Sequence, residues 1–106
     1  MCKFATVMWY AVMSMSVHNC KVTIINQRGL HARAAAKFVS VANQFPCDVQ
    51  VGRDLDNLHN GKNIMSVLML AASQGTELYL QASGEQAAEA LKALQQLIAE
   101  RFAEDN

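Results

Sequence analysis

His31 and Arg33 are the residues of this sequence whose types and spacing could carry out chemistry. They stand where the hydrophobic pattern changes. Apolar and polar residues alternate over 20–24, as in a β-strand, whereas apolar residues recur at helical spacing over 35–42. Gly29 lies between the two patterns, where a small residue allows the backbone to turn. We therefore expect His31 to lie at, or one residue from, the first turn of a helix.

A histidine at a helix N-terminus is suited to phosphoryl chemistry. The first N–H groups of a helix have no partners within it, and together with the helix dipole they bind anions. A ring nitrogen of His31 is nucleophilic near neutral pH, and the guanidinium of Arg33 can bind phosphate oxygens. The residues suggest a histidine that accepts a phosphoryl group and passes it on. The simpler alternative is a polar residue that merely ends a helix.

Three motifs of the sequence are similar to those of one protein family. The first is Gly-Leu-His-Ala-Arg at 29–33, the second is Gly-Lys-Asn-Ile-Met-Ser-Val at 61–67, and the third is Leu-Gln-Ala-Ser-Gly-Glu at 80–85. In this order they resemble the HPr family, the histidine-containing phosphocarrier proteins of the bacterial phosphoenolpyruvate-dependent phosphotransferase system. The resemblance covers residues 17–102 of the chain.

The resemblance implies a mechanism for His31. Its Nδ1 nitrogen would accept a phosphoryl group from phosphorylated enzyme I, with phosphoenolpyruvate as the original donor, and would pass it to a IIA domain. The backbone N–H groups of Ala32 and Arg33, together with the Arg33 side chain, would offset the added negative charge. Such a protein is a phosphoryl carrier with a phosphohistidine intermediate rather than a stand-alone enzyme.

The second motif opens a segment over 63–71 that is apolar on nearly every side and is predicted to be a short helix, with Asn63 as a good N-cap residue. Only one side of such a helix can face a core. Exposed apolar residues there indicate a docking surface, and methionine suits a surface that must fit several partners. The resemblance assigns that surface to Ile64, Met65 and Leu68. The alternative is that the whole helix is buried.

Two positions depart from the usual pattern of the family. Ala34 stands where most members have proline, so it restores an N–H group in the first turn of the helix and removes a rigid residue. We expect function to survive this change. Asn63 stands where many members carry a serine that a regulatory kinase phosphorylates, and asparagine has no hydroxyl group to modify.

The composition disfavours several other classes of function. With 106 residues, 52% of them apolar, and a formal net charge of zero, the chain should fold as one domain and has no basic stretch for nucleic acid. Cys2, Cys20 and Cys47 have no CxxC spacing, so we expect reduced thiols in a cytoplasmic protein. His18 and His59 lack nearby metal-ligand partners and are expected to be solvated. We expect a monomer without metal, cofactor or membrane span.

The remaining periodicity predicts an α+β domain. Strands are expected at 20–25, 47–51, 57–60 and 76–82, and helices at 32–44, at 63–71, and from a capping box of Ser83 and Gln86 to Phe102. Helices should cover one face of the sheet, since each strand has one polar face. The resemblance adds an HPr-like open-faced β-sandwich: βαββαβα, with four antiparallel strands in the order 1-4-2-3 and three helices. Residues 104–106 are expected to be a frayed acidic end.

Residues 1–15 precede the resemblance and are expected to be a poorly ordered extension of the domain at 16–106. The apolar run over 4–13 faintly resembles a signal peptide, but it is too short and lacks a convincing cleavage site. It is also too short to span a bilayer. A start codon assigned too early, a weak apolar tether and a packing arm are the alternatives.

Two other classes of function can be weighed against the phosphocarrier. A regulatory binding module of the same fold would act without phosphotransfer, but the presence of both His31 and Arg33 speaks against it. An enzyme with a cysteine nucleophile is disfavoured because Cys20 and Cys47 fall at inward-facing strand positions. Within the family, the sequence is compatible with both the sugar-transport branch and the nitrogen-related regulatory branch.

Overall fold

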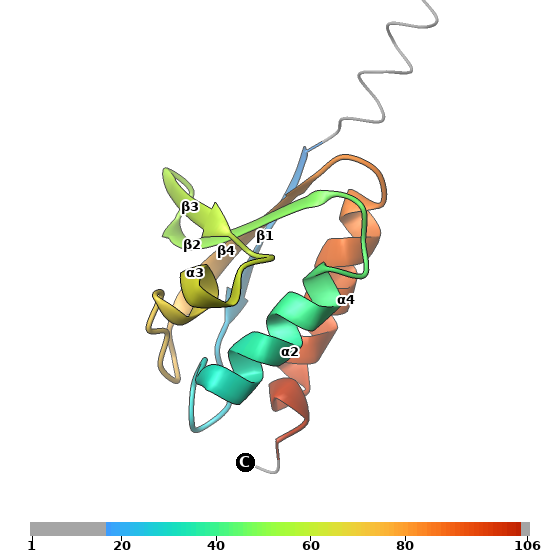
Figure 1. Ribbon diagram of the computed structural model, residues 1–106. Coiled ribbons are helices and arrows are strands. Elements are labelled where there is room, and N and C mark those ends of the chain that lie inside the picture. Colours follow the sequence, from blue (N-terminus) through green and yellow to red (C-terminus); the bar gives the residue numbers. More distant parts are fainter. Residues whose placement is uncertain (1–16, 105–106) are drawn as a thin grey trace, which may run out of the picture.

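Figure 1 shows the computed structural model of the chain, which describes residues 17–104. Within that range the elements follow the predicted order of strand, helix, strand, strand, helix, strand and helix. They are β1 (Val17–Thr23), α2 (Ala32–Ala42), β2 (Asp48–Asp54), β3 (Asn57–Asn60), α3 (Ile64–Leu68), β4 (Glu77–Ser83), α4 (Ala87–Ala99) and the short 3₁₀ turn η1 (Arg101–Ala103).

The strands form one antiparallel sheet in the order β1-β4-β2-β3, which confirms the order expected from the resemblance. β4 lies between β1 and β2, so that Leu80 faces Cys20 on one side and Val51 on the other. Successive residues of a strand point to opposite faces of the sheet. On β2 and β4 one face is therefore fully buried, and it consists of Val49, Val51, Leu78, Leu80 and Ala82.

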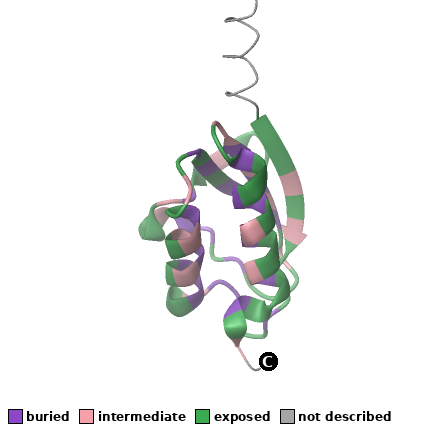
Figure 2. Cartoon of the chain, turned by 90° about the vertical axis from the view of Figure 1, so that its right-hand side faces the viewer, coloured by how far each residue is buried: buried purple, intermediate pink, exposed green. Residues whose placement is uncertain are grey.

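α2, α3 and α4 cover one face of this sheet (Figure 1). α2 packs against both α3 and α4. The alanines of α2 that face inward, Ala34, Ala35 and Ala42, allow the helix to lie close to its neighbours, while Phe38 fills the space between them. Figure 2 shows the resulting division, with exposed residues on the outer side of the helices and buried residues turned toward the sheet.

The last helix begins later than the sequence predicts, because the capping box of Ser83 and Gln86 does not form. β4 extends through Ser83, which pairs with Val17 on one side and Asp48 on the other. Gly84 then turns with a positive φ, and Gln86 precedes α4 without any side-chain cap bond. Pairing with two neighbouring strands outweighs the local preference of a serine for an N-cap position.

Other predicted boundaries also differ from the structure: β1 begins at Val17 rather than at 20, and α4 ends at Ala99 rather than at Phe102. β2 continues to Asp54, beyond the end predicted at 51, and its pairing with β3 becomes irregular between Val51 and Asp54.

α3 ends at Leu68, earlier than predicted, because Ala71 has a positive φ of 50°. The guanidinium of Arg53 on β2 donates hydrogen bonds to the carbonyl oxygens of Leu70 and Ala71 at 3.0 and 3.1 Å, so a side chain from the sheet holds the turn that follows this helix.

Gly29 is required in the loop that leads from β1 to His31. Its φ is +69°, and a Cβ atom added there would lie 2.6 Å from the carbonyl oxygen of Ala72. The same oxygen accepts a hydrogen bond from the N–H of Leu30 at 2.8 Å. The loop is therefore pressed against the segment before β4, and this contact determines where His31 stands.

The expected extension at 1–15 lies outside the described residues. Among residues 17–104, no helix combines the length and apolar character needed to cross a bilayer.

We expect Gly29→Ala to lower the free energy of unfolding by about 1–3 kcal/mol more than Gly75→Ala does, because only the first adds a collision with backbone. Gly75 is the matched control, since it also has a positive φ of 92° but open space around its missing side chain. Urea unfolding of both variants measures the difference. An equal decrease in the free energy of unfolding for the two variants would show that the loop does not pack tightly against Ala72.

Candidate functional site

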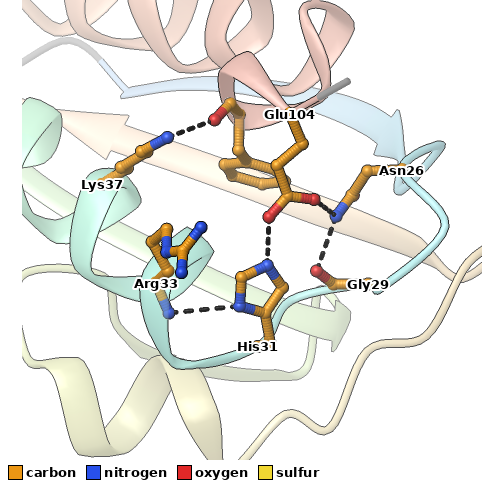
Figure 3. A network of polar contacts seen from close by, with 7 residues as sticks. Asn26, Gly29, His31, Arg33, Lys37 and Glu104 are labelled. Atoms are coloured by element: carbon orange, nitrogen blue, oxygen red, sulfur yellow. Dashed lines mark hydrogen bonds and ion pairs between the residues drawn. The ribbon is translucent and has the colours of Figure 1, made fainter. Parts of the chain in front are cut away.

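His31 is the N-cap residue of α2, as the change of hydrophobic pattern predicts. Its backbone is extended, and its carbonyl oxygen accepts a hydrogen bond from the N–H of Ala35 at 2.8 Å. The side chain turns back over the helix end, where Nδ1 accepts a hydrogen bond from the backbone N–H of Arg33 at 3.2 Å (Figure 3). The ring is thereby held against the N-terminus of the helix.

A carboxylate from the other end of the chain contacts the opposite side of the ring. Glu104 follows η1, and its Oε2 pairs with His31 Nε2 (Figure 3). Asn26, in the loop after β1, donates from Nδ2 to Glu104 Oε1 at 2.9 Å and to the carbonyl oxygen of Gly29 at 2.8 Å. The side chain of Glu104 is 8% exposed, so the prediction of a frayed acidic end is wrong for this residue.

These contacts indicate which nitrogen of His31 carries the proton in the neutral ring. A backbone N–H donates to Nδ1, so Nδ1 must offer a lone pair. Nε2 then carries the proton and donates it to the carboxylate of Glu104. The ring therefore presents Nδ1 as its nucleophilic nitrogen, directed at the first turn of α2.

The surroundings of Glu104 favour its ionised form. Desolvation raises the pKa of this carboxyl group, but the hydrogen bonds from His31 and Asn26 and the electrostatic attraction of His31 and Arg28 outweigh it, so the pKa lies below its ordinary value. An ionised carboxylate can only accept hydrogen bonds, which suits the donating Nε2 of His31.

A strained turn brings Glu104 to the ring. The residues of η1, Arg101, Phe102 and Ala103, all have positive φ angles, of 58°, 55° and 61°. Each such residue costs about 1–2 kcal/mol. The ring of Phe102 is fully buried, which offsets about 1.5–3 kcal/mol, and its carbonyl oxygen accepts a hydrogen bond from Lys37 Nζ at 2.6 Å. The core and α2 together anchor the end of the described chain.

The site has features that suit an incoming anion. The side chain of Arg33 lies beside the ring of His31, and Lys37 follows on the same helix (Figure 3). Ala32, Arg33 and Ala34 form the first turn of α2, where N–H groups lack partners within the helix. The side chain of His31 is 25% exposed, so another protein can reach it.

The apolar surface on and after α3 differs in part from the sequence prediction. Ile64 and Met65 are 39% and 63% exposed, while Leu68 is half-buried. Met69, just after the helix, is 79% exposed and was not identified from the sequence. Of the residues of α3, only Val67 is buried, so the alternative of a wholly buried helix is wrong. We call Ile64, Met65, Leu68 and Met69 the apolar patch.

The other candidate groups do not join the site. Cys20 and Cys47 are both free thiols. Burial raises the pKa of each, so the nucleophilic thiolate is scarce at neutral pH. His18 and His59 are exposed on β1 and β3, and His18 lies within its strand rather than before it. In the part of the chain that the structure describes, no group of three or more possible metal ligands is found.

Known proteins share both the motif around His31 and the fold. A family model described as "PTS HPr component phosphorylation site" matches residues 18–100. The phosphocarrier protein HPr of Pseudomonas aeruginosa is 58% identical over 84 residues, which are 79% of this chain and 93% of that protein. The chain belongs to the HPr family. The phosphocarrier function within the phosphotransferase system, expected from the three motifs, is thereby confirmed.

Other members of the HPr family give the same result. The HPr of Neisseria meningitidis serogroup B is 47% identical over 83 residues, which are 78% of this chain and 92% of that protein. The crystal structure of HPr-C-His from Thermoanaerobacter tengcongensis superposes with a TM-score of 0.78 at 38% identity, over 84% of this chain and 99% of that one. A Bacillus anthracis HPr structure has a TM-score of 0.73 at 34% identity, over 78% and 98%.

Sequence reasoning missed Glu104 and Asn26 as members of the site of this HPr chain. Glu104 lies beyond residues 18–100, which the family model matches, and it begins an acidic run that looks solvated. The one usable signal was Phe102, a large apolar residue close to the end of the sequence. Its burial brings Glu104 toward the core.

We expect the carboxylate of Glu104 to make stability depend on pH. Its pKa is lowered in the folded protein, so its contribution to the free energy of unfolding is fully present above the ordinary value of 4.5 and is lost as the pH falls through the lower folded value. The groups that face it are His31, Asn26 and Arg28. Urea unfolding of wild type and Glu104→Gln, from neutral pH down to acid, should give a stability difference that shrinks toward acid.

The exposed Glu100 offers a matched control for that measurement, since Glu100→Gln removes a carboxylate on the outer side of the same chain end. A stability difference for Glu104→Gln that stays constant across this pH range would contradict the lowered pKa of the Glu104 carboxyl group in the folded protein.

Proposed function

We propose that Nδ1 of His31 is the atom that accepts and donates the phosphoryl group in this HPr-family protein. The observation that carries the proposal is the orientation of the ring. Nε2 is engaged by the carboxylate of Glu104, while Nδ1 faces the first turn of α2 and the N–H of Arg33. The resemblance of residues 29–33 to the family motif supports the same nitrogen.

The proposed transfer balances without a cofactor. The lone pair of Nδ1 attacks the phosphorus of the phosphorylated donor, the bond between phosphorus and the donor breaks, and Nε2 keeps its proton. The N–H of Arg33 then loses Nδ1 as its acceptor and can donate to a phosphoryl oxygen instead. The guanidinium of Arg33 and the N–H of Ala32 add to the positive potential around the new dianion.

The exposure of the site suits a carrier that must give up its phosphoryl group. The side chain of His31 is 25% exposed, so water screens the stabilising charges and the phosphohistidine does not lie in a deep energy well. A buried site would hold the dianion more strongly and would also keep the accepting protein from reaching His31. Arg33 therefore stabilises the bound phosphoryl group without trapping it.

The partners of this carrier are the protein that donates the phosphoryl group and the proteins that accept it. The donor is phosphorylated enzyme I, which takes its phosphoryl group from phosphoenolpyruvate, and the acceptors are IIA components of sugar transport or of nitrogen-related regulation. The carrier acts as a cytoplasmic monomer. Docking uses the apolar patch, with Ile64, Met65 and Leu68 as its predicted members and Met69 beside them. Such contacts are weak and fast, as a shuttle between enzymes requires.

Intact mass after incubation with phosphoenolpyruvate and enzyme I tests the role of His31. We expect one acid-labile phosphoryl group on the wild type and none on His31→Ala. His59→Ala is the control, because His59 is exposed on β3 and should leave phosphorylation intact. A folded wild type that takes no phosphoryl group from either branch of enzyme I would leave a regulatory binding module as the better description.

We expect Met65→Asp to raise the KM for phosphorylation about tenfold or more, because a charge in the apolar patch must be desolvated on docking. Thermal stability should change little, since this side chain is 63% exposed. Val17→Asp is the control: Val17 is 55% exposed at the start of β1, which lies at the other end of the molecule from the loop before α2 (Figure 1). An unchanged KM for Met65→Asp would exclude the patch from docking.

A further inference from the structure

We propose that Glu104 is a positioning residue for phosphotransfer: its carboxylate holds His31 in the form that carries its proton on Nε2, and it stabilises the positive charge that the ring gains when Nδ1 is phosphorylated. This inference rests on the proposed role of His31 and deepens it. The direct contact between Glu104 Oε2 and His31 Nε2 is its first support. Glu104 lies outside residues 18–100, which match the family model.

The charge on the ring changes during the proposed transfer. Before attack, the ring is neutral, with a proton on Nε2 and a lone pair on Nδ1. Once Nδ1 bonds to phosphorus and Nε2 keeps its proton, the ring carries a positive charge. A carboxylate at Nε2 therefore interacts more strongly with the transition state and the product than with the resting ring, which is the condition for accelerating the step. The 8% exposure of the Glu104 side chain limits screening of this interaction by water.

The chemical type of the group that accepts the hydrogen bond from Nε2 matters as much as its charge. A carboxylate has no proton to donate, so Nε2 must be the donor and Nδ1 must be the free nucleophile. A glutamine at this position could turn its NH₂ group toward Nε2, which would move the ring proton to Nδ1 and remove the nucleophile. The pair of Glu104 and His31 therefore selects the productive form of the ring.

The surrounding contacts hold the carboxylate in one orientation. Asn26 donates to Glu104 Oε1 at 2.9 Å, and the same amide nitrogen donates to the carbonyl oxygen of Gly29 at 2.8 Å. Asn26 thus ties the carboxylate to the loop that positions His31. From the other side, Lys37 of α2 holds the carbonyl oxygen of Phe102, whose ring is buried in the core. A solvated chain end would have none of these contacts.

The negative charge of Glu104 could instead oppose an incoming phosphoryl group. The geometry argues against this, because Glu104 contacts Nε2 and Nδ1 lies on the other side of the ring, beside the N–H of Arg33. The two roles predict opposite effects of removing the charge: a slower transfer if Glu104 positions the ring, and a faster one if it repels the donor.

Phosphorylation kinetics of the full chain with enzyme I distinguish these roles. We expect Glu104→Gln and Glu104→Ala to lower kcat about tenfold or more, with KM for the carrier changed less than about twofold. Glu100→Gln should match wild type, because the side chain of Glu100 is exposed and accepts a hydrogen bond from Gln96 of α4, away from His31. A raised KM with normal kcat would assign Glu104 to docking. That result, like a faster transfer, would overturn the proposal.

The ¹⁵N chemical shifts of the His31 ring give a readout that a merely structural role would not move. In unphosphorylated wild type we expect the form with the proton on Nε2, and in Glu104→Gln an increased share of the form with the proton on Nδ1. Thermal melts check that the variants are folded.

The two proposals can fail separately. If the wild type takes no phosphoryl group, the role of His31 is refuted. If the tautomer of His31 still changes in Glu104→Gln, the selection of that tautomer by Glu104 stands. Normal phosphorylation with normal kcat and an unchanged tautomer in Glu104→Gln would refute the role of Glu104 alone.

Discussion

The ring of His31 is held from two opposite directions, and the chemistry of the site depends on this arrangement. A backbone N–H of α2 donates to Nδ1, and the carboxylate of Glu104 accepts from Nε2. With both contacts in place, only one neutral form of the ring satisfies its neighbours. An imidazole that is fixed in orientation and in protonation can then react without first reorganising, although it stands partly exposed at a helix end.

This arrangement includes backbone strain and an unsatisfied buried polar atom, both of which are unfavourable in free energy. Successive residues of η1 adopt left-handed backbone conformations, and the side-chain oxygen of Asn26 has no hydrogen-bond partner among the described residues although it is buried. An unsatisfied buried polar atom costs about 1–3 kcal/mol. Burial of Phe102 and the bond from Lys37 offset part of the strain. Strain of this kind gathers at functional sites, and here it lies beside His31, the residue proposed to carry the phosphoryl group.

The rest of the fold supplies a rigid frame for one exposed reactive group. Gly29 lets the loop after β1 press against Ala72, and the inward alanines of α2 let that helix lie close to α3 and α4. Arg53 on β2 bonds to the turn that follows α3, so the chain just after the apolar patch is tied to the sheet. The ring of His31 and the apolar patch, which is proposed as the docking surface, are therefore placed relative to each other by packed elements.

The sequence by itself determined the order of the elements and the alternation of buried and polar residues along β2 and β4, because both follow from short-range periodicity. The position of His31 at the start of α2 and the family follow from the same periodicity and from contiguous motifs. Only the tertiary structure decided the start of α4 and the contact of Glu104 with His31. Pairing of Ser83 with two strands cancels a capping box that is locally favourable. The contact of Glu104 with His31 joins the two ends of the domain, and it arises because burial of Phe102 turns the chain back over α2, which no local pattern records.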